Sequence, residues 1–392
     1  MKINIITIAL FTLLAFSCST TANTWKNAKL NTHISQGYTR STDNNFHGNS
    51  EKSNGSFAMR EFGLNASTNL SSSLFAAGQI LARNTGQDDD EDLSLDYALI
   101  DYTHSPAATK SFGFRLGRIK NPLGFYNETR DVAFTRPSVI LPQSIYFDRT
   151  RDLSLSADGL HVYSKTQFNT EITLGLLEPR IDKKSTTTSL LGPSASGELE
   201  SNTGNVWNIT HEQSAFTLTY SGAALELDYN PPTHLNQSAG SIKFLVNILS
   251  FQYDNEFLSI TSEYADRRFK FHNLETLLPY KKLNGESYYL QLTAFISPRL
   301  KSYIRYDVLY SNKDDRSGKK FEQLTLGTRP RYSQFAKDWT LGIRWHINRH
   351  WMINLEHHWI DGTAWLPIQN NPIPNETERK WRLFAAIISF RY

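Results

Sequence analysis

Apolar and polar residues alternate along most of the chain, and the pattern is clearest at its end. The even-numbered positions from Phe384 to Tyr392 are all apolar, which places them on one face of a β-strand. We assign Arg382, Ser389 and Arg391 to the opposite, polar face. A strand with one apolar face and a terminal aromatic residue suits an environment with lipid on one side and water on the other. The ending therefore predicts a membrane-spanning strand.

The same alternation, interrupted by turn residues, predicts sixteen strands. In the ninth predicted strand, near 215–229, the apolar residues change from one face to the other at Ser221-Gly222. This phase slip indicates either a β-bulge or a tight hairpin. The predicted strands lie near 28–39, 57–69, 73–83, 93–104, 111–119, 156–165, 168–177, 204–212, 215–229, 240–253, 257–270, 285–297, 299–311, 336–347, 350–361 and 379–392.

The connections between these strands alternate between short and long. Short ones include Ser297-Pro298-Arg299 and Asn348-Arg349, and long ones include 84–92, 120–154 and 178–203. Short turns opposite long loops are typical of a transmembrane barrel, and sixteen strands place both termini on the short-turn side. About 23 residues per strand and connection fits a porin-sized barrel. We therefore predict an all-β fold, an antiparallel up-and-down transmembrane β-barrel of sixteen strands that forms one domain.

The N-terminus has the features of a secretory signal peptide. Lys2 precedes an apolar run from Ile3 to Phe16, and the small and polar residues Ser17 to Ala22 follow. The run is shorter than the roughly 20 apolar residues that a membrane helix needs. We predict a signal peptide at 1–22 and a barrel at 23–392. Lipidation of Cys18 is the alternative, and cleavage after Ala22 leaves a mature chain without cysteine.

The C-terminal strand resembles the assembly signal of bacterial outer-membrane β-barrels. The resemblance rests on the apolar face and the final aromatic residue, and it assigns the signal to Phe390 and Tyr392. It implies recognition by the barrel assembly machinery and a location in the outer membrane of a Gram-negative bacterium.

Charge and hydropathy exclude some classes of function. The formal net charge is +3 and the mean hydropathy is −0.44, so a strongly basic nucleic-acid-binding protein is excluded. Such values are compatible with a barrel, because only every second strand residue faces lipid. Trp345, Trp351, Trp359 and Trp365 fit an interfacial aromatic girdle.

Alternation also assigns cations to the lumen. A cation facing lipid at mid-membrane costs about 2–4 kcal/mol, so basic residues within apolar-faced strands should point inward. They line the pore or form solvated ion pairs across the wall. The candidates are Arg115, Lys243, Arg305 and Arg344.

The longest connection, 120–154, follows the fifth predicted strand and should pack against other parts of the protein. It contains five aromatic residues and three prolines, a composition unlike that of disordered loops. Arg130, Arg149 and Arg151 are candidate anion ligands there. Nearby carboxylates offer them ion pairs that would fold the loop instead, namely Glu128, Asp131, Asp148 and Asp152.

One segment resembles the phosphate-selective porin O/P family. The resemblance rests on Leu116-Gly117-Arg118-Ile119-Lys120-Asn121-Pro122-Leu123-Gly124 and on the downstream Thr135-Arg136-Pro137. It implies a sixteen-stranded, trimeric, anion-preferring channel with basic residues around an inward-folded third loop. The residues carried over by position are Arg118, Lys120 and Arg136.

The leading interpretation is passive diffusion of small hydrophilic solutes, with anions such as phosphate preferred. The alternatives are an outer-membrane hydrolase, for which no motif places Ser, His and Asp together, and a non-conducting structural or adhesive barrel. We therefore expect no enzyme activity, no catalytic residue and no cofactor.

Two further clusters contain residue types that can bind metal ions. The Glu356-His357-His358 cluster lacks a third ligand of definable position, so no metal site is predicted. The acidic run 87–92 is either a solvated loop, a contact with lipopolysaccharide through divalent cations or a contact with a neighbouring subunit. Membrane lipid and lipopolysaccharide are expected partners.

Overall fold

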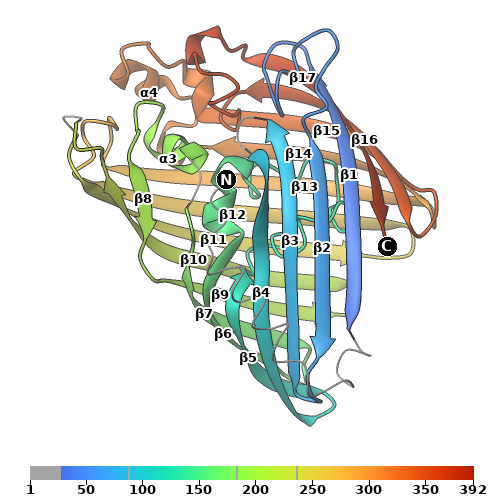
Figure 1. The fold of residues 1–392 in the computed structure, drawn as a ribbon. Coiled ribbons are helices and arrows are strands. Elements are labelled where there is room, and N and C mark those ends of the chain that lie inside the picture. The colour runs from blue at the N-terminus through green and yellow to red at the C-terminus, as the bar shows by residue number, and fades with distance from the viewer. Residues whose placement is uncertain (1–27, 87–88, 182–183, 235–236) are drawn as a thin grey trace.

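A computed structural model describes residues 28–86, 89–181, 184–234 and 237–392, in which antiparallel strands form a closed barrel (Figure 1). The barrel closes where the first strand pairs with the last, with His33 opposite Arg391. The predicted sixteen-stranded antiparallel barrel is confirmed. The proposed signal peptide and Cys18 lie outside the described residues.

Sixteen strands make the continuous wall, and the additional short strand β8 pairs with the loop end of β10. The strands are β1 Lys29–Ser41, β2 Arg60–Asn69, β3 Leu74–Gly86, β4 Asp89–Ala107, β5 Lys110–Lys120, β6 Ser156–Lys165, β7 Thr170–Glu178, β8 Glu198–Ser201, β9 Gly204–Gln213, β10 Phe216–Asn230, β11 Gly240–Asp254, β12 Leu258–His272, β13 Lys282–Ser297, β14 Leu300–Tyr310, β15 Phe335–His346, β16 Trp351–Gly362 and β17 Lys380–Arg391.

Short helices lie in the connections. They are the 3-10 helices η3 Asp148–Thr150, η4 Lys313–Asp315, η5 Arg331–Gln334 and η6 Pro374–Glu376 and the α-helices α2 Arg151–Ser154, α3 Lys184–Leu191 and α4 Lys319–Leu324. None of the helices in the described part of the chain is long and apolar enough to cross a membrane. The long connection predicted at 84–92 is wrong, because β3 continues to Gly86 and β4 begins at Asp89.

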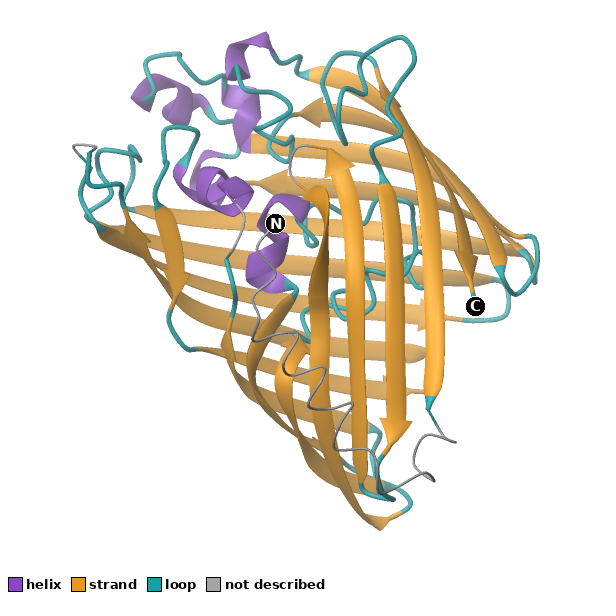
Figure 2. Ribbon diagram, viewed as in Figure 1, coloured by secondary structure: helices purple, strands orange, loops and turns teal. Residues whose placement is uncertain are grey.

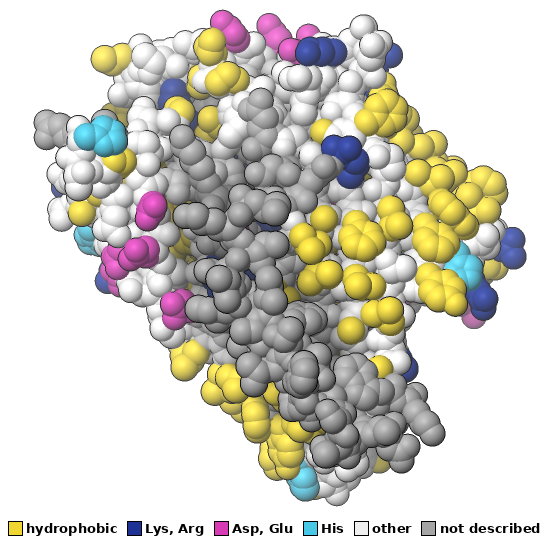
Figure 3. Space-filling model, in the orientation of Figure 1, with side chains coloured by type: hydrophobic (Ala, Val, Ile, Leu, Met, Phe, Trp, Pro, Cys, Tyr) yellow, Lys and Arg dark blue, Asp and Glu magenta, His cyan; other side chains and the backbone are white. Residues whose placement is uncertain are grey.

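The outer face of the wall is apolar over its central band. Trp339, Leu341, Ile343 and Trp345 are all exposed on β15, as the alternation predicts. In Figure 3, hydrophobic side chains gather over the outer surfaces of β1 to β3. This is the surface that a barrel presents to lipid.

The face predicted for Arg382 is wrong. Successive strand residues point to opposite faces, so Arg382 shares the outward face of Phe384 and Ile388, which are exposed. Ser389 is buried on the inward face, where its hydroxyl bonds that of Ser35 across the β1–β17 pair at 2.9 Å.

The phase slip in β10 is neither a bulge nor a hairpin. Its register with β11 runs without a shift from Phe216 opposite Tyr253 to Tyr229 opposite Gly240. Instead, the apolar face changes sides along the strand. Leu218 and Tyr220 are exposed on the outside, whereas Leu225 and Leu227 are buried inside.

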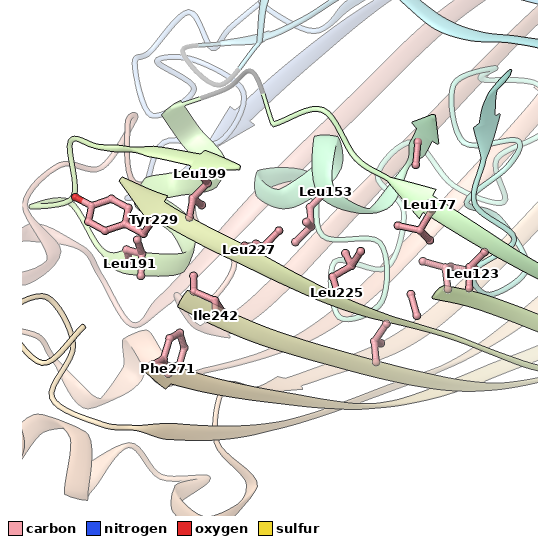
Figure 4. Close-up of a cluster of buried hydrophobic side chains, with 14 of the residues drawn as sticks. Leu123, Leu153, Leu177, Leu191, Leu199, Leu225, Leu227, Tyr229, Ile242 and Phe271 are labelled. Atoms are coloured by element: carbon pink, nitrogen blue, oxygen red, sulfur yellow. The ribbon is translucent and has the colours of Figure 1, made fainter. Parts of the chain in front are cut away.

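The inward apolar residues of β10 and β11 belong to a cluster within the loop end of the barrel (Figure 4). Leu225, Leu227 and Ile242 pack there with Leu123 and Leu153 from the long connection. The prediction that Lys243 faces the lumen is therefore wrong, because its neighbours on both sides, Ile242 and Phe244, occupy the inward face. Its side chain is 54% exposed and pairs with the outward Glu226 at 3.4 Å.

Candidate functional site: the segment inside the barrel

The connection between β5 and β6, residues 121–155, contacts inward-facing side chains from most of the barrel wall. Ser221 of β10 accepts a hydrogen bond from the Gly124 backbone N–H at 2.9 Å, and Asn208 of β9 donates to the Pro122 carbonyl at 2.9 Å. Figure 2 shows this segment within the ring of strands. We call residues 121–155 the inner segment.

A buried carboxylate on β12 holds one side of the inner segment. Glu263 accepts hydrogen bonds from the Phe125 backbone N–H at 2.9 Å and from the Tyr146 hydroxyl at 2.6 Å. Ser250 and Tyr289 of the neighbouring strands also donate to it, at 2.6 and 2.8 Å. A buried carboxylate needs this many donors to offset its lost hydration.

The opposite wall holds the inner segment through β14 and β16. The backbone N–H groups of Val139 and Ile140 donate to Glu356 at 3.0 and 2.7 Å. Arg305 donates to the Ser138 hydroxyl at 2.8 Å and to the Ile140 carbonyl at 3.1 Å. The segment is thus tied to both sides of the barrel.

Arg136 makes a two-pronged ion pair with the wall. Its two terminal nitrogens donate to the carboxylate oxygens of Glu61 on β2 at 2.8 and 2.6 Å, and both side chains are buried. This planar geometry is the strongest form of an Arg–carboxylate contact. Arg344 of β15 donates to the Arg136 carbonyl. Arg136 and Arg344 therefore both fix the position of the segment.

The other predicted cations of the segment also have partners. Lys120 pairs with Asp131 and, at 2.8 Å, with Asp96 of β4. The remaining contacts are Arg130 to Asp148 at 2.7 Å, Arg151 to Asp131, and Arg149 to the carbonyls of Leu366 and, at 3.1 Å, Ala364. These contacts agree with the interpretation in which the cations of the segment form ion pairs with nearby carboxylates and so fold the segment.

Several cavities adjoin the inner segment, and two of them have several charged lining residues in common. The larger, which we call the vestibule, has a volume of about 750 Å³ and lies among the loops and the upper wall. The smaller, which we call the throat, has a volume of about 10 Å³ and is lined by Met59, Val139, Ile140 and Leu141 together with charged residues. The two share four lining residues, namely His47, Arg83, Asp148 and Arg151. A space of the throat's size holds about one water molecule.

Arginines outnumber carboxylates on the cavity walls. Seven arginines line the vestibule or the throat, against three aspartates, an excess of four positive charges; they are Arg83, Arg118, Arg130, Arg136, Arg149, Arg151 and Arg180 against Asp96, Asp148 and Asp152. Glu61 and Asp131 lie behind this lining and pair with some of the arginines. The lining is thus basic, although the surrounding network is close to balanced.

Burial and the arginines set the ionisation of two groups shared by both cavities. Burial lowers the pKa of His47 to about 4, so this imidazole is neutral at pH 7. Although burial alone would raise the pKa of Asp148, the positive charges of Arg83 and Arg130 outweigh it and lower the pKa to about 2. Asp148 therefore remains ionised between the arginines.

The residues predicted for the pore have different positions. Arg118 lines the vestibule, with its guanidinium 3.9 Å from the Asp158 carboxylate. Arg115 lines neither cavity; it pairs with Asp101 at 3.0 Å and lies over the Tyr163 ring. Arg305 and Arg344 are buried behind the inner segment, and Lys243 lies outside the barrel.

Sequence reasoning missed Arg83, Arg180 and His47. The sequence could have identified Arg83, because it lies two residues from Leu81 and four from Gln79 in a predicted strand. It should therefore share their inward face. His47 and Arg180 lie in connections, where alternation carries no information. Their place at the vestibule follows only from how the loops fold.

His358 is held within the barrel wall by two carboxylates. Its two ring nitrogens lie 2.7 Å from Asp338 and 3.0 Å from Glu356, and the group is buried in the wall. It lines neither the vestibule nor the throat. Over the described residues, no cluster of three or more metal-ligating side chains has a suitable arrangement.

Comparisons with known proteins place the fold. No protein-family model matches the sequence, and no match is found among curated proteins. Solved porin and channel structures are similar over nearly the whole chain. The outer-membrane channel DcaP of Acinetobacter baumannii is 10% identical over 93% of this chain and 97% of its own, with a TM-score of 0.60.

Two other solved structures agree. OprB of Pseudomonas putida is 11% identical over 96% of this chain and 97% of its own, with a TM-score of 0.58. The anion-selective porin from Comamonas acidovorans is 11% identical over 93% and 98%, with a TM-score of 0.57. At these identities the likeness shows a porin fold, and it does not single out the phosphate-selective porin O/P family.

Proposed function

We propose that this protein is an outer-membrane porin that lets small hydrophilic solutes diffuse passively and prefers anions. The observation that carries the anion preference is the excess of four positive charges on the lining of the vestibule and throat. Fixed charges of one sign lower the barrier for ions of the other sign. Phosphate is one anion of suitable charge, in line with the resemblance at Leu116–Gly124.

The remaining expectations from the sequence belong to the same proposal. A signal peptide at 1–22 directs export, and Phe390 and Tyr392 present the C-terminal strand to the barrel assembly machinery. The working unit is a homotrimer in a membrane that contains lipopolysaccharide. The apolar outer face of the wall and the pairing of β1 with β17 support a stably inserted barrel.

The test is a planar-bilayer recording in a salt gradient with purified protein. Wild type should give stepwise conductance and a reversal potential on the anion side. The double substitution Arg118→Gln and Arg180→Gln removes two charges from the vestibule and should move that potential toward zero.

The matched control is Lys243→Gln with Lys270→Gln, which removes two outward charges and should leave the potential unchanged. A cation-selective wild type would contradict the anion preference alone, whereas a complete lack of conductance would contradict the porin proposal.

A non-conducting structural barrel is the second candidate, and the packing of the inner segment favours it. Apolar clusters pack this segment on both sides, and the throat holds about one water molecule. The recordings separate the two candidates, because only a porin gives stepwise conductance. A variant lacking residues 124–147 should conduct under either candidate, whereas the full chain should conduct only if the protein is a porin.

A further inference from the structure

A groove on the outer face of the barrel combines cations with aromatic rings. It lies near the loop end of β14 to β17 and has a volume of about 590 Å³. Its lining contains the cations Lys337, Lys380 and Arg382, the carboxylates Asp43 and Asp361, and the aromatic residues Tyr306, Trp339, Trp359 and Trp381, so cations outnumber carboxylates by one. We call it the outer groove.

Strand register places the groove residues in two neighbouring rows. Tyr306 lies opposite Trp339, which lies opposite Trp359, which lies opposite Arg382. The next row toward the loops contains Lys337, Asp361 and Lys380 on successive strands. The two lysines therefore lie directly beyond the aromatic row, and Arg382 lies at the end of that row.

In the described part of the chain the three cations have no carboxylate partner, whereas Asp361, one of the two carboxylates of the groove, has a cation of its own. Asp361 is neutralised by Arg379, which donates to it at 2.6 and 2.9 Å. Lys337, Lys380 and Arg382 have no carboxylate within 4 Å among the residues that the structure describes. Two aromatic rings lie near the Lys337 ammonium, at 5.9 and 6.0 Å.

The surface below the groove is apolar and bare. Leu341 and Ile343 continue the outward face of Trp339, and Phe384 and Ile388 continue that of Arg382; all four are exposed. Trp339 and Trp359 are themselves 51% and 43% exposed. A free inorganic ion would contact the cations and leave this apolar surface uncovered. An amphiphile would contact the cations with its headgroup and cover the apolar surface with its chains.

We propose that the outer groove binds the phosphate-bearing headgroup of a membrane lipid, whose acyl chains lie along the apolar faces of β15 to β17. Lys and Arg just beyond an aromatic girdle lie at the depth of lipid headgroups, and each contributes to the attraction of anionic lipid. The inference rests on membrane insertion, which is part of the proposed function, and does not depend on whether the barrel conducts.

The test measures lipid A, a phosphorylated and acylated disaccharide, bound to the detergent-solubilised barrel by native mass spectrometry. The triple variant Lys337→Gln, Lys380→Gln and Arg382→Gln should weaken the apparent affinity at least about tenfold. The matched control replaces three outward lysines in a row across β11 to β13 that lies farther from the aromatic residues, namely Lys243, Lys270 and Lys282. It should change the affinity less than about twofold.

Equal losses in both variants would overturn the site, because they would reflect net charge alone. Displacement of lipid A by excess inorganic phosphate would overturn the lipid as ligand, since the groove would then be a site for the free ion. Unchanged binding of lipid A by the triple variant would also overturn the proposed site. Bilayer recordings on the same samples separate this result from channel function, because the triple variant should keep the wild-type conductance steps.

Discussion

Cations inside and outside this barrel differ in what they contact. Inside, Arg136, Arg130 and Lys120 are buried, and each has a carboxylate partner. Outside, Lys337 and Lys380 lie beside aromatic rings and a carboxylate that Arg379 already occupies. The inner cations therefore hold the inner segment in place and contribute only their excess charge to the cavities, whereas the outer ones remain available to a ligand.

The largest effect should follow from breaking an inner pair. Glu61→Gln leaves Arg136 and Arg83 buried without their shared carboxylate, which should cost about 3–5 kcal/mol in the free energy of unfolding. Urea unfolding of the detergent-solubilised barrel measures this cost. The control is Glu226→Gln, which breaks the exposed pair with Lys243 and should cost less than about 1 kcal/mol. Equal costs would contradict the comparison.

The second-largest effect should come from acidification, which should lower the free energy of unfolding through the buried His47. The pKa of His47 is lowered to about 4 from an ordinary value of 6.5, so the unfolded chain binds a proton there before the folded barrel does. The stability that neutral His47 contributes is complete above pH 6.5 and is lost as the pH falls toward 4, by at most about 3 kcal/mol. Unfolding measured at pH 7 and pH 4 tests this, and His47→Gln should remove the part of the difference that the imidazole causes.

Removing an inner carboxylate should sharpen anion selectivity. Asp148→Asn keeps the shape of the side chain but removes a negative charge that both cavities share. The anion-to-cation permeability ratio should rise about twofold to fivefold. Reversal potentials in a salt gradient measure the ratio, and Asp158→Asn at the exposed pair with Arg180 gives a weaker reference. An unchanged ratio would show that Asp148 does not face the permeating ions.

The smallest effect should come from the outer cations. Lys337→Gln with Lys380→Gln removes charges without carboxylate partners, so the free energy of unfolding in detergent should change by less than about 0.5 kcal/mol. The same urea titration detects this. A loss of 2 kcal/mol or more would mean that the two lysines support the fold.

Alternation predicted the barrel wall well because lipid imposes one rule on every strand. In the sheet, residues two apart share a face, so a lipid-facing band makes strands such as β15 visible from sequence alone. The same rule placed Arg305 and Arg344 inside. It failed at Lys243, because the loop ends of β10 and β11 extend past the apolar band and bury their apolar faces against the inner segment.

The partners of the loop cations could not be predicted. Arg136 pairs with Glu61, which is 75 residues away, and Glu356 accepts from Val139 across 217 residues. No local pattern relates such positions, and each loop arginine had several carboxylates within reach. His47 and Arg180 reach the vestibule from separate connections, so the cavity exists only once the loops have folded.

The sequence by itself determined the membrane-facing wall, the number of strands and the presence of an unusual long connection. These features depend on the alternation of lipid-facing and water-facing residues along a strand, and this alternation is visible in any short stretch of the sequence. The tertiary structure decided which cations are paired, how the inner segment packs against the wall and where the exposed groove on β14 to β17 lies. These depend on contacts between distant segments, and electrostatic and packing energies are set by three-dimensional distance rather than by position along the chain.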